Sequence, residues 1–142
     1  MKILVVEDND RLRKSLVEYL RDEGFAADGA ADGEEGLYRA REWDYDAIVL
    51  DPPKFGRGPK NETWRFETDY PKLLEHVRAL MSDKPLFVIA TVYAVRLSYA
   101  AVGQSLAGAM GGGNVVCGEM AIRESSGRNL VLPTGLFARW TP

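Results

Sequence analysis

Residues 47–56 read AIVLDPPKFG, and this stretch decides the fold because a short apolar run ends at an acid and two prolines. Four apolar residues bounded in this way are typical of a strand buried in a parallel sheet, with Asp51 at its carboxyl end. Adjacent prolines stop helices and central strands, so residues 52–63 are predicted to form a loop. The character of the amino-acid sequence changes at this point, so the chain has two parts, residues 1–51 and residues 52–142.

Strands and helices alternate on both sides of this stretch. Strands are predicted at 2–6, 25–29, 47–50, 85–91, 114–122 and 130–140, and helices at 9–23, 34–43, 66–81 and 97–110. The helix at 66–81 has the clearest amphipathic spacing, and Pro71 suggests that it starts near that residue. This order predicts one α/β domain over residues 1–142. We expect a three-layer, doubly wound sheet of the Rossmann-like or flavodoxin-like kind, mostly parallel, with a C-terminal antiparallel hairpin.

Composition limits the classes of protein to which the chain can belong. Its 142 residues fit one compact domain, and 46% hydrophobic with 27% charged residues is a globular composition. The net charge of -3 gives no general electrostatic reason to bind nucleic acid. The single cysteine excludes an internal disulfide, and no apolar stretch is long enough to span a membrane. We therefore expect a cytoplasmic protein that does not associate with membranes.

Residues 1–51 carry the pattern MKILVVEDND…ADGEEGL…DYDAIVLD. This pattern resembles the first half of a receiver domain from winged-helix-type response regulators. The resemblance implies that Asp51 accepts a phosphoryl group from a histidine kinase. It also implies that Glu7 and Asp8 help to hold Mg²⁺, together with Asp51 and the backbone carbonyl of Pro53.

The residue chemistry supports the same acidic site. Glu7, Asp8 and Asp51 all follow predicted strands, and ligand sites of doubly wound sheets form outside the carboxyl ends of strands. Clustered carboxylates favour a bound dication, which can neutralise charge during phosphoryl transfer. Thr91 stands where receivers have a serine or threonine. Their lysine after the fifth strand has no counterpart in residues 115–120, so the receiver pattern is incomplete.

Residues 49–142, beginning VLDPPKFGRG, resemble the C-terminal part of class I S-adenosylmethionine-dependent methyltransferases that act on ribosomal RNA. This resemblance implies that Asp51, Pro52 and Pro53 lie near the methyl acceptor, with Phe55 beside the substrate. It also implies the strand order 2-1-3-4-6-5, numbered along the six predicted strands. The cofactor loop of that family is glycine-rich, whereas residues 7–10 are Glu-Asp-Asn-Asp, so we expect no methyl transfer.

Basic residues with interleaved aromatic residues follow the two prolines. Lys54, Arg57, Lys60 and Arg65 could contact RNA phosphates, but a solvated loop is the simpler interpretation. Nucleic acid is therefore not an expected partner.

Taken together, the two resemblances predict an engineered chimera joined near Leu50 and Asp51. On this interpretation the chain is a designed scaffold without a complete active site. It is not an enzyme, it requires no cofactor, and it has no evolved partner. The alternative is a residual phosphoacceptor that binds Mg²⁺ and receives phosphoryl groups from a histidine kinase. A second alternative is a remnant that binds RNA or acts as a methyltransferase.

Overall fold

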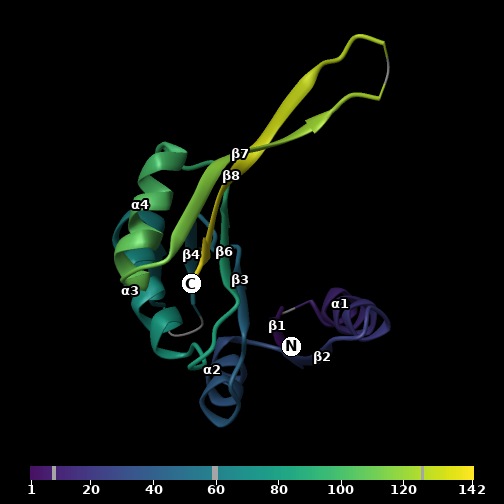
Figure 1. Ribbon diagram of the computed structural model, residues 1–142, viewed down its shortest axis with the longest axis vertical. Coiled ribbons are helices and arrows are strands. Elements are labelled where there is room, and N and C mark those ends of the chain that lie inside the picture. The colour runs from purple at the N-terminus through teal and green to yellow at the C-terminus, as the bar shows by residue number, and fades with distance from the viewer. Residues whose placement is uncertain (8, 59–60, 126) are drawn as a thin grey trace. The chain divides into compact units, whose positions relative to one another are not determined.

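The computed structural model describes residues 1–7, 9–58, 61–125 and 127–142 (Figure 1). The chain forms two compact units, which are described separately below. The first unit comprises residues 1–48 and 79–87, and the second comprises residues 49–78 and 88–142. The border between the two units, at residues 48 and 49, lies close to Asp51, where the character of the sequence changes.

The first unit contains a parallel strand pair and two helices. Strands β1 (Lys2–Val6) and β2 (Ala26–Ala30) pair in register from Lys2 opposite Ala26 to Val6 opposite Ala30. Helix α1 (Asp10–Asp22) connects them, and helix α2 (Gly33–Glu42) follows β2. Both helices begin at side-chain caps, because Asn9 accepts a hydrogen bond from the amide of Leu12 and Asp32 accepts one from the amide of Glu35.

Helix α1 buries little of its apolar surface. Val17 is its one buried residue, whereas Leu12 and Leu16, which recur at helical spacing, are 47% and 39% exposed. A Cβ atom added to Gly29 of β2 would come within 3.3 Å of Val17 Cγ2, which shows where this helix packs on the strand. The helix therefore contributes one small side chain to the core, and its leucines stay largely outside it.

Polar contacts fix the rest of the first unit. Asp46 accepts hydrogen bonds from the amide of Lys2 at 3.3 Å and from the hydroxyl of Ser82 at 3.4 Å. Its carbonyl accepts a further bond from the amide of Leu86, and Tyr45 forms a β-bridge with Met81. These contacts explain why residues 79–87 belong to the first unit although they are distant in sequence.

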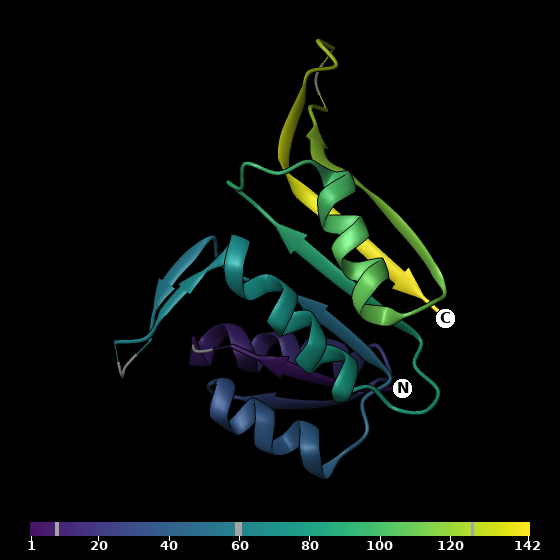
Figure 2. The same cartoon turned by 90° about the vertical axis from the view of Figure 1, so that its left-hand side faces the viewer.

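The second unit is built on an antiparallel hairpin. Strands β3 (Ala47–Leu50) and β6 (Phe87–Val92) cross the border between the units, and β7 (Asn114–Arg123) and β8 (Val131–Thr141) lie wholly in the second. The four strands have the order β3-β6-β8-β7. Helix α4 (Tyr99–Met110), capped by Ser98, lies along β7 and β8 (Figure 2).

Helix α3 (Phe66–Ala79) and a short hairpin complete this unit. Strands β4 (Phe55–Arg57) and β5 (Thr63–Arg65) form the hairpin, which runs directly into α3 (Figure 2). The helix starts at Phe66 and contains Pro71, so the predicted start near Pro71 is wrong. The carboxylate of Asp69 accepts a hydrogen bond from the amide of Arg65, which holds the first turn ahead of the proline.

The largest fully buried side chains all belong to the second unit. Phe66 stacks on Tyr70 with ring centroids 4.4 Å apart, and Leu106 of α4 has no exposed surface. Among the described residues, the six largest fully buried side chains are Phe66, Leu74, Val88, Val92, Val102 and Leu106. Burial of apolar surface, the main driving force of folding, is therefore concentrated in the second unit.

The predicted sheet is confirmed in part. The pairing of β2 with β1 and the order β3-β6-β8-β7 reproduce two segments of the predicted strand order, but they lie in separate sheets. The prediction of a mostly parallel sheet matches only in part. Strands β1 and β2 pair in parallel, and the bridge between Tyr45 and Met81 is parallel, whereas β6 with β8, β7 with β8 and β4 with β5 are antiparallel. The loop predicted at 52–63 also contains strand β4 and the start of β5.

Among the described residues, no helix is both long enough and apolar enough to cross a bilayer.

Candidate functional site

Asp51 is held at the end of strand β3 by a residue of strand β6. The hydroxyl of Thr91 donates a hydrogen bond to Asp51 Oδ1 at 2.7 Å and lies 3.3 Å from the carbonyl oxygen of Leu50. Asp51 is exposed, and Thr91 is half-buried. Within the described part of the chain, no second side chain donates a hydrogen bond to this carboxylate. The carboxylate therefore belongs to an exposed residue that is held through Oδ1.

Asp51 and Thr91 come together because the apolar runs that precede them form neighbouring strands. Ala47–Leu50 and Phe87–Val92 form adjacent strands of one sheet, and this pairing brings Thr91 to Asp51. The sequence placed Thr91 at the position of the receiver hydroxyl, and the structure confirms that it lies beside Asp51.

The segment after Asp51 is ordered by a tryptophan. Pro52 is buried, and the carbonyl of Pro53 accepts a hydrogen bond from Trp64 Nε1 at 2.6 Å. The carbonyl of Lys54 accepts a second bond from the amide of Phe66 at 3.0 Å. The sequence pattern did not predict this contact. The pairing of β4 with β5, which the prolines concealed, is what brings Trp64 back to Pro53.

The β4–β5 hairpin presents basic and aromatic side chains on one face. Phe55 is opposite Arg65 and Arg57 is opposite Thr63, so these four side chains lie on the same side of the ribbon. All four are exposed, and Phe55 is 54% exposed. Lys60, the remaining basic residue of the predicted stretch, lies outside the described residues.

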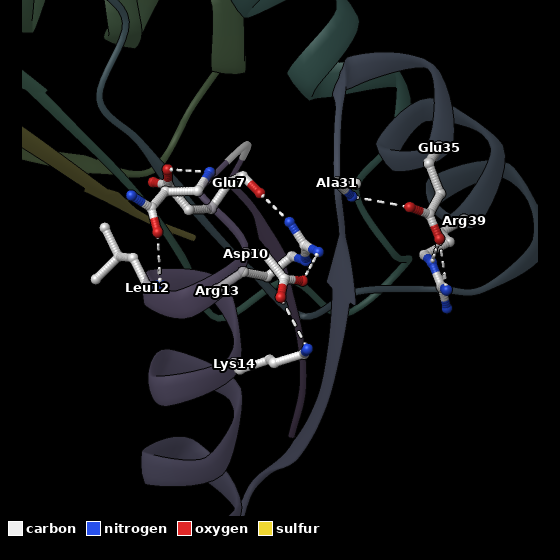
Figure 3. A network of polar contacts seen from close by, with 9 residues as sticks. Glu7, Asp10, Leu12, Arg13, Lys14, Ala31, Glu35 and Arg39 are labelled. Carbon is white, nitrogen blue, oxygen red and sulfur yellow. Dashed lines mark hydrogen bonds and ion pairs between the residues drawn. The ribbon is translucent and has the colours of Figure 1, made fainter.

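Glu7 is engaged locally, at the turn between β1 and α1 (Figure 3). Its carboxylate accepts a hydrogen bond from the amide of Asn9 at 3.0 Å, and its carbonyl accepts one from the guanidinium of Arg13 at 2.7 Å. Arg13 also forms an ion pair with Asp10 at 2.6 Å. These contacts tie Glu7 to the start of α1.

Hydrogen bonds, assisted by nearby positive charge, lower the pKa of two carboxyls in the same view, Asp10 and Glu35 (Figure 3). A hydrogen bond from Lys14 lowers the pKa of Asp10, and Arg13 and Lys14 add favourable charge. The amide of Ala31 and the guanidinium of Arg39 lower the pKa of Glu35. Both carboxyls therefore remain ionised at neutral pH.

The predicted Mg²⁺ site remains a prediction. Glu7 belongs to the first unit, Asp51 and Pro53 belong to the second, and Asp8 lies outside the described residues. Among the residues that the structure describes, no three His, Cys, Asp or Glu side chains form a group that could hold a metal. The donor types still suit a hard cation, since Glu7, Asp51 and the Pro53 carbonyl all offer oxygen.

The turn after β1 does not have the features expected of a cofactor loop for S-adenosylmethionine. Glu7 and Asn9 carry side chains where a close backbone approach would favour glycine, and Arg13 covers the carbonyl of Glu7. Since these residues do not fit that group, no reaction step is assigned to it.

Comparison with known proteins gives two partial similarities. No family model matches the chain. The regulatory protein HprR of Escherichia coli is 43% identical over 51 residues, and the two-component response regulator PhoP of Pseudomonas aeruginosa is 45% identical over 51 residues. Each match covers 36% of this chain and 23% of the relative. The activator IrlR of Burkholderia pseudomallei is 34% identical over 90 residues, which is 63% of this chain and 34% of that protein.

The solved structures give the second similarity. A SAM-dependent methyltransferase from Agrobacterium tumefaciens has a TM-score of 0.77 and 30% identity, covering 98% of this chain and 48% of that one. The SMU.776 structure, complexed with SAH, has a TM-score of 0.62 and 18% identity, and it covers 99% of this chain and 39% of that one. The second likeness shows the fold alone.

These findings correct one prediction and support part of another. The expectation that the chain is not an enzyme is contradicted by its likeness to the Agrobacterium methyltransferase over nearly its whole length. The two-part resemblance is confirmed at the level of response regulators on one side and methyltransferases on the other. The comparisons favour the predicted alternatives over an inactive scaffold.

Proposed function

We propose that the chain is a phosphoacceptor, with Asp51 as the residue that receives the phosphoryl group. The observation that carries the proposal is the 2.7 Å hydrogen bond from Thr91 to Oδ1 of the exposed residue Asp51. The similarity to two-component response regulators over 51 residues supports the same assignment.

The chemistry is an in-line displacement at phosphorus. Asp51 Oδ2 forms the new bond to phosphorus, while the bond from phosphorus to the donor atom breaks and the donor leaves with the electron pair. The donor atom is the acetate oxygen of acetyl phosphate or the imidazole nitrogen of a phosphohistidine. Oδ1 becomes the carbonyl oxygen of the acyl phosphate and continues to accept the hydrogen bond from Thr91. Mg²⁺, for which Glu7, Asp8, Asp51 and the Pro53 carbonyl are the proposed ligands, would neutralise charge on the phosphoryl oxygens.

Intact-mass analysis after incubation with acetyl phosphate and Mg²⁺ tests this function. The unaltered chain is expected to gain the mass of one phosphoryl group, and Asp51→Asn is expected to gain none. Asp83→Asn is the matched control, because Asp83 is an exposed acid outside the site. An adduct that persists in Asp51→Asn, or no adduct on folded protein, would contradict the proposal.

Thr91→Val sharpens the same experiment. Valine keeps the branched shape and removes the hydroxyl, so phosphorylation is expected to proceed more slowly in this variant. Equal rates in Thr91→Val and the unaltered chain would show that the hydrogen bond has no part in the reaction. If Asp51 does react, a histidine kinase is the proposed natural donor.

We infer further that the chain joins two parental halves near Leu50 and Asp51. The border between the compact units at 48 and 49 and the two partial similarities support this origin. Both parental patterns have an acidic residue directly after an apolar strand. Asp51 therefore fits either pattern, and the strand before it needs no change.

A second candidate function is RNA binding by the β4–β5 hairpin, in keeping with the likeness to a methyltransferase. Phe55 can stack on a base while Arg57 and Arg65 contact phosphates, and this combination is typical of single-strand binding. Fluorescence anisotropy with a labelled single-stranded RNA tests it. We expect salt-dependent binding that is weakened at least about tenfold by Arg57→Ala with Phe55→Ala. The exposed residue Arg41 provides the control Arg41→Ala, and binding that is equal in all variants would exclude this surface.

A further inference from the structure

The outer edge of strand β7 is a long, regular edge that no strand in the described part of the chain covers. In the order β3-β6-β8-β7 the strand is terminal, and it runs for ten residues from Asn114 to Arg123. The bulge in this hairpin places its extra residue, Thr134, on β8, because Met120 is opposite Gly135 and Ala121 is opposite Pro133. Strand β7 itself is therefore unbroken.

The direction of the edge groups follows from one hydrogen bond. The amide of Glu124 donates to the carbonyl of Leu130, so the backbone groups of Glu124 face β8. Because these groups alternate along an antiparallel strand, those of 119, 121 and 123 face outward. Unpaired amides and carbonyls along such an edge are a template for another strand.

Two charged residues of this edge have no partner within their own hairpin. Glu119 is opposite Leu136 and Arg123 is opposite Val131, so neither faces an opposite charge on β8. Four residues of a strand separate Glu119 from Arg123 by about 13 Å, which is too far for an ion pair within one chain. Among the described residues, neither side chain forms an ion pair.

We propose that β7 pairs in antiparallel fashion with β7 of a second copy of this chain, centred on Ala121. In that register Glu119 of each copy is opposite Arg123 of the other, and Met120 is opposite Ile122. The three pairs formed by residues 119, 121 and 123 would exchange about six backbone hydrogen bonds. Ile122, which is 63% exposed in the single chain, would gain an apolar neighbour.

Charge complementarity makes the second copy the partner that fits. A two-fold axis at Ala121 creates the Glu119–Arg123 pair twice, and opposite charges directly across a strand pair stabilise it while like charges destabilise it. The arrangement is isologous, so it closes as a dimer.

Sedimentation velocity over a concentration series up to about 100 μM tests the dimer. We expect concentration-dependent dimers, weakened at least about tenfold in Glu119→Arg and in Arg123→Glu. The double variant Glu119→Arg with Arg123→Glu restores opposite charges and is expected to restore the dimer. Glu75→Arg, the same charge change at an exposed position of α3, is the control and should dimerise like the unaltered chain.

Three results would overturn the proposal. They are a chain that stays monomeric throughout the series, single variants that dimerise like the unaltered chain, and a double variant as weak as the singles. Melting temperatures of all variants establish that they are folded. Because each single variant reverses one charge independently, loss of folding in one leaves the test intact in the other.

Discussion

Both units contain helices and strands but bury their side chains very differently. In the first unit the buried hydrophobic residues are Val17, Ala27, Ala30, Tyr45 and Ala47, which are mostly small, and Leu12 and Val6 are 47% and 50% exposed. The second unit contains every one of the largest fully buried side chains. The first unit, which contains most of the segment similar to response regulators, is therefore held together mainly by helix caps and polar contacts. The large apolar core belongs to the second unit.

Truncating one leucine in each unit should give the largest contrast. Leu106 of α4 is fully buried, and Leu106→Ala is expected to lower the free energy of unfolding by about 3 kcal/mol. Leu16 of α1 is 39% exposed, and Leu16→Ala should cost less than about 1 kcal/mol. Urea denaturation of both variants measures the difference. Equal losses would mean that the first unit has a core of its own.

Two helical glycines offer a second, smaller contrast. A Cβ atom at Gly36 would meet the stiff side chain of Val6 at 2.9 Å, whereas one at Gly108 would meet nothing within 4 Å. Gly36→Ala is expected to destabilise the chain by about 1 kcal/mol. Gly108→Ala should stabilise it by about 0.5–1 kcal/mol, because alanine favours the helix. Thermal unfolding of the pair measures both signs, and a stabilised Gly36→Ala would disprove the close approach of α2 to β1.

The helix caps test whether the units unfold independently. Asn9 caps α1 and Ser98 caps α4, and alanine at either position should cost about 1 kcal/mol. Hydrogen exchange followed by mass spectrometry localises the loss. Asn9→Ala is expected to speed exchange in the first unit alone, and Ser98→Ala in the second. Faster exchange throughout the chain in both variants would show a single cooperative unit.

The smallest expected effect is on acid stability. Hydrogen bonds lower the folded-state pKa of Glu35 in the first unit and of Asp69 in the second. A lowered pKa contributes stability above the unfolded-state value, and this contribution is lost as the pH falls through the folded-state value. Unfolding midpoints below about pH 4.5 should therefore depend less on pH in Glu35→Gln and Asp69→Asn. An unchanged pH dependence in both variants would contradict the shifts.

Much of this fold could be predicted from the sequence, because most of its signals are local. The apolar run at 47–50 and the helix ranges 9–23 and 34–43 lie close to the elements observed. The hairpin at β4 and β5 escaped prediction because three prolines obscure two three-residue strands. Nor could helical spacing show that Leu12 and Leu16 stay exposed, since periodicity identifies a face but not what covers it.

The candidate site was predictable only in part. Asp51 follows from the strand that precedes it, and Thr91 from the receiver-like pattern. The contact between Trp64 and the Pro53 carbonyl depends on the long-range pairing of β4 with β5, which no local signal indicates. Whether Glu7, Asp8, Asp51 and the Pro53 carbonyl share one cation remains a prediction, which Mg²⁺ titration can test.

The most direct test of the central claim is to locate the phosphoryl group. After labelling with acetyl phosphate and Mg²⁺, the acyl phosphate can be reduced with borohydride and the modified residue identified by peptide mass spectrometry. Our account predicts a single modified aspartate at Asp51, dependent on Mg²⁺ and slower to form in Thr91→Val. Modification spread over other exposed acids such as Asp83, or none at Asp51 in folded protein, would contradict it.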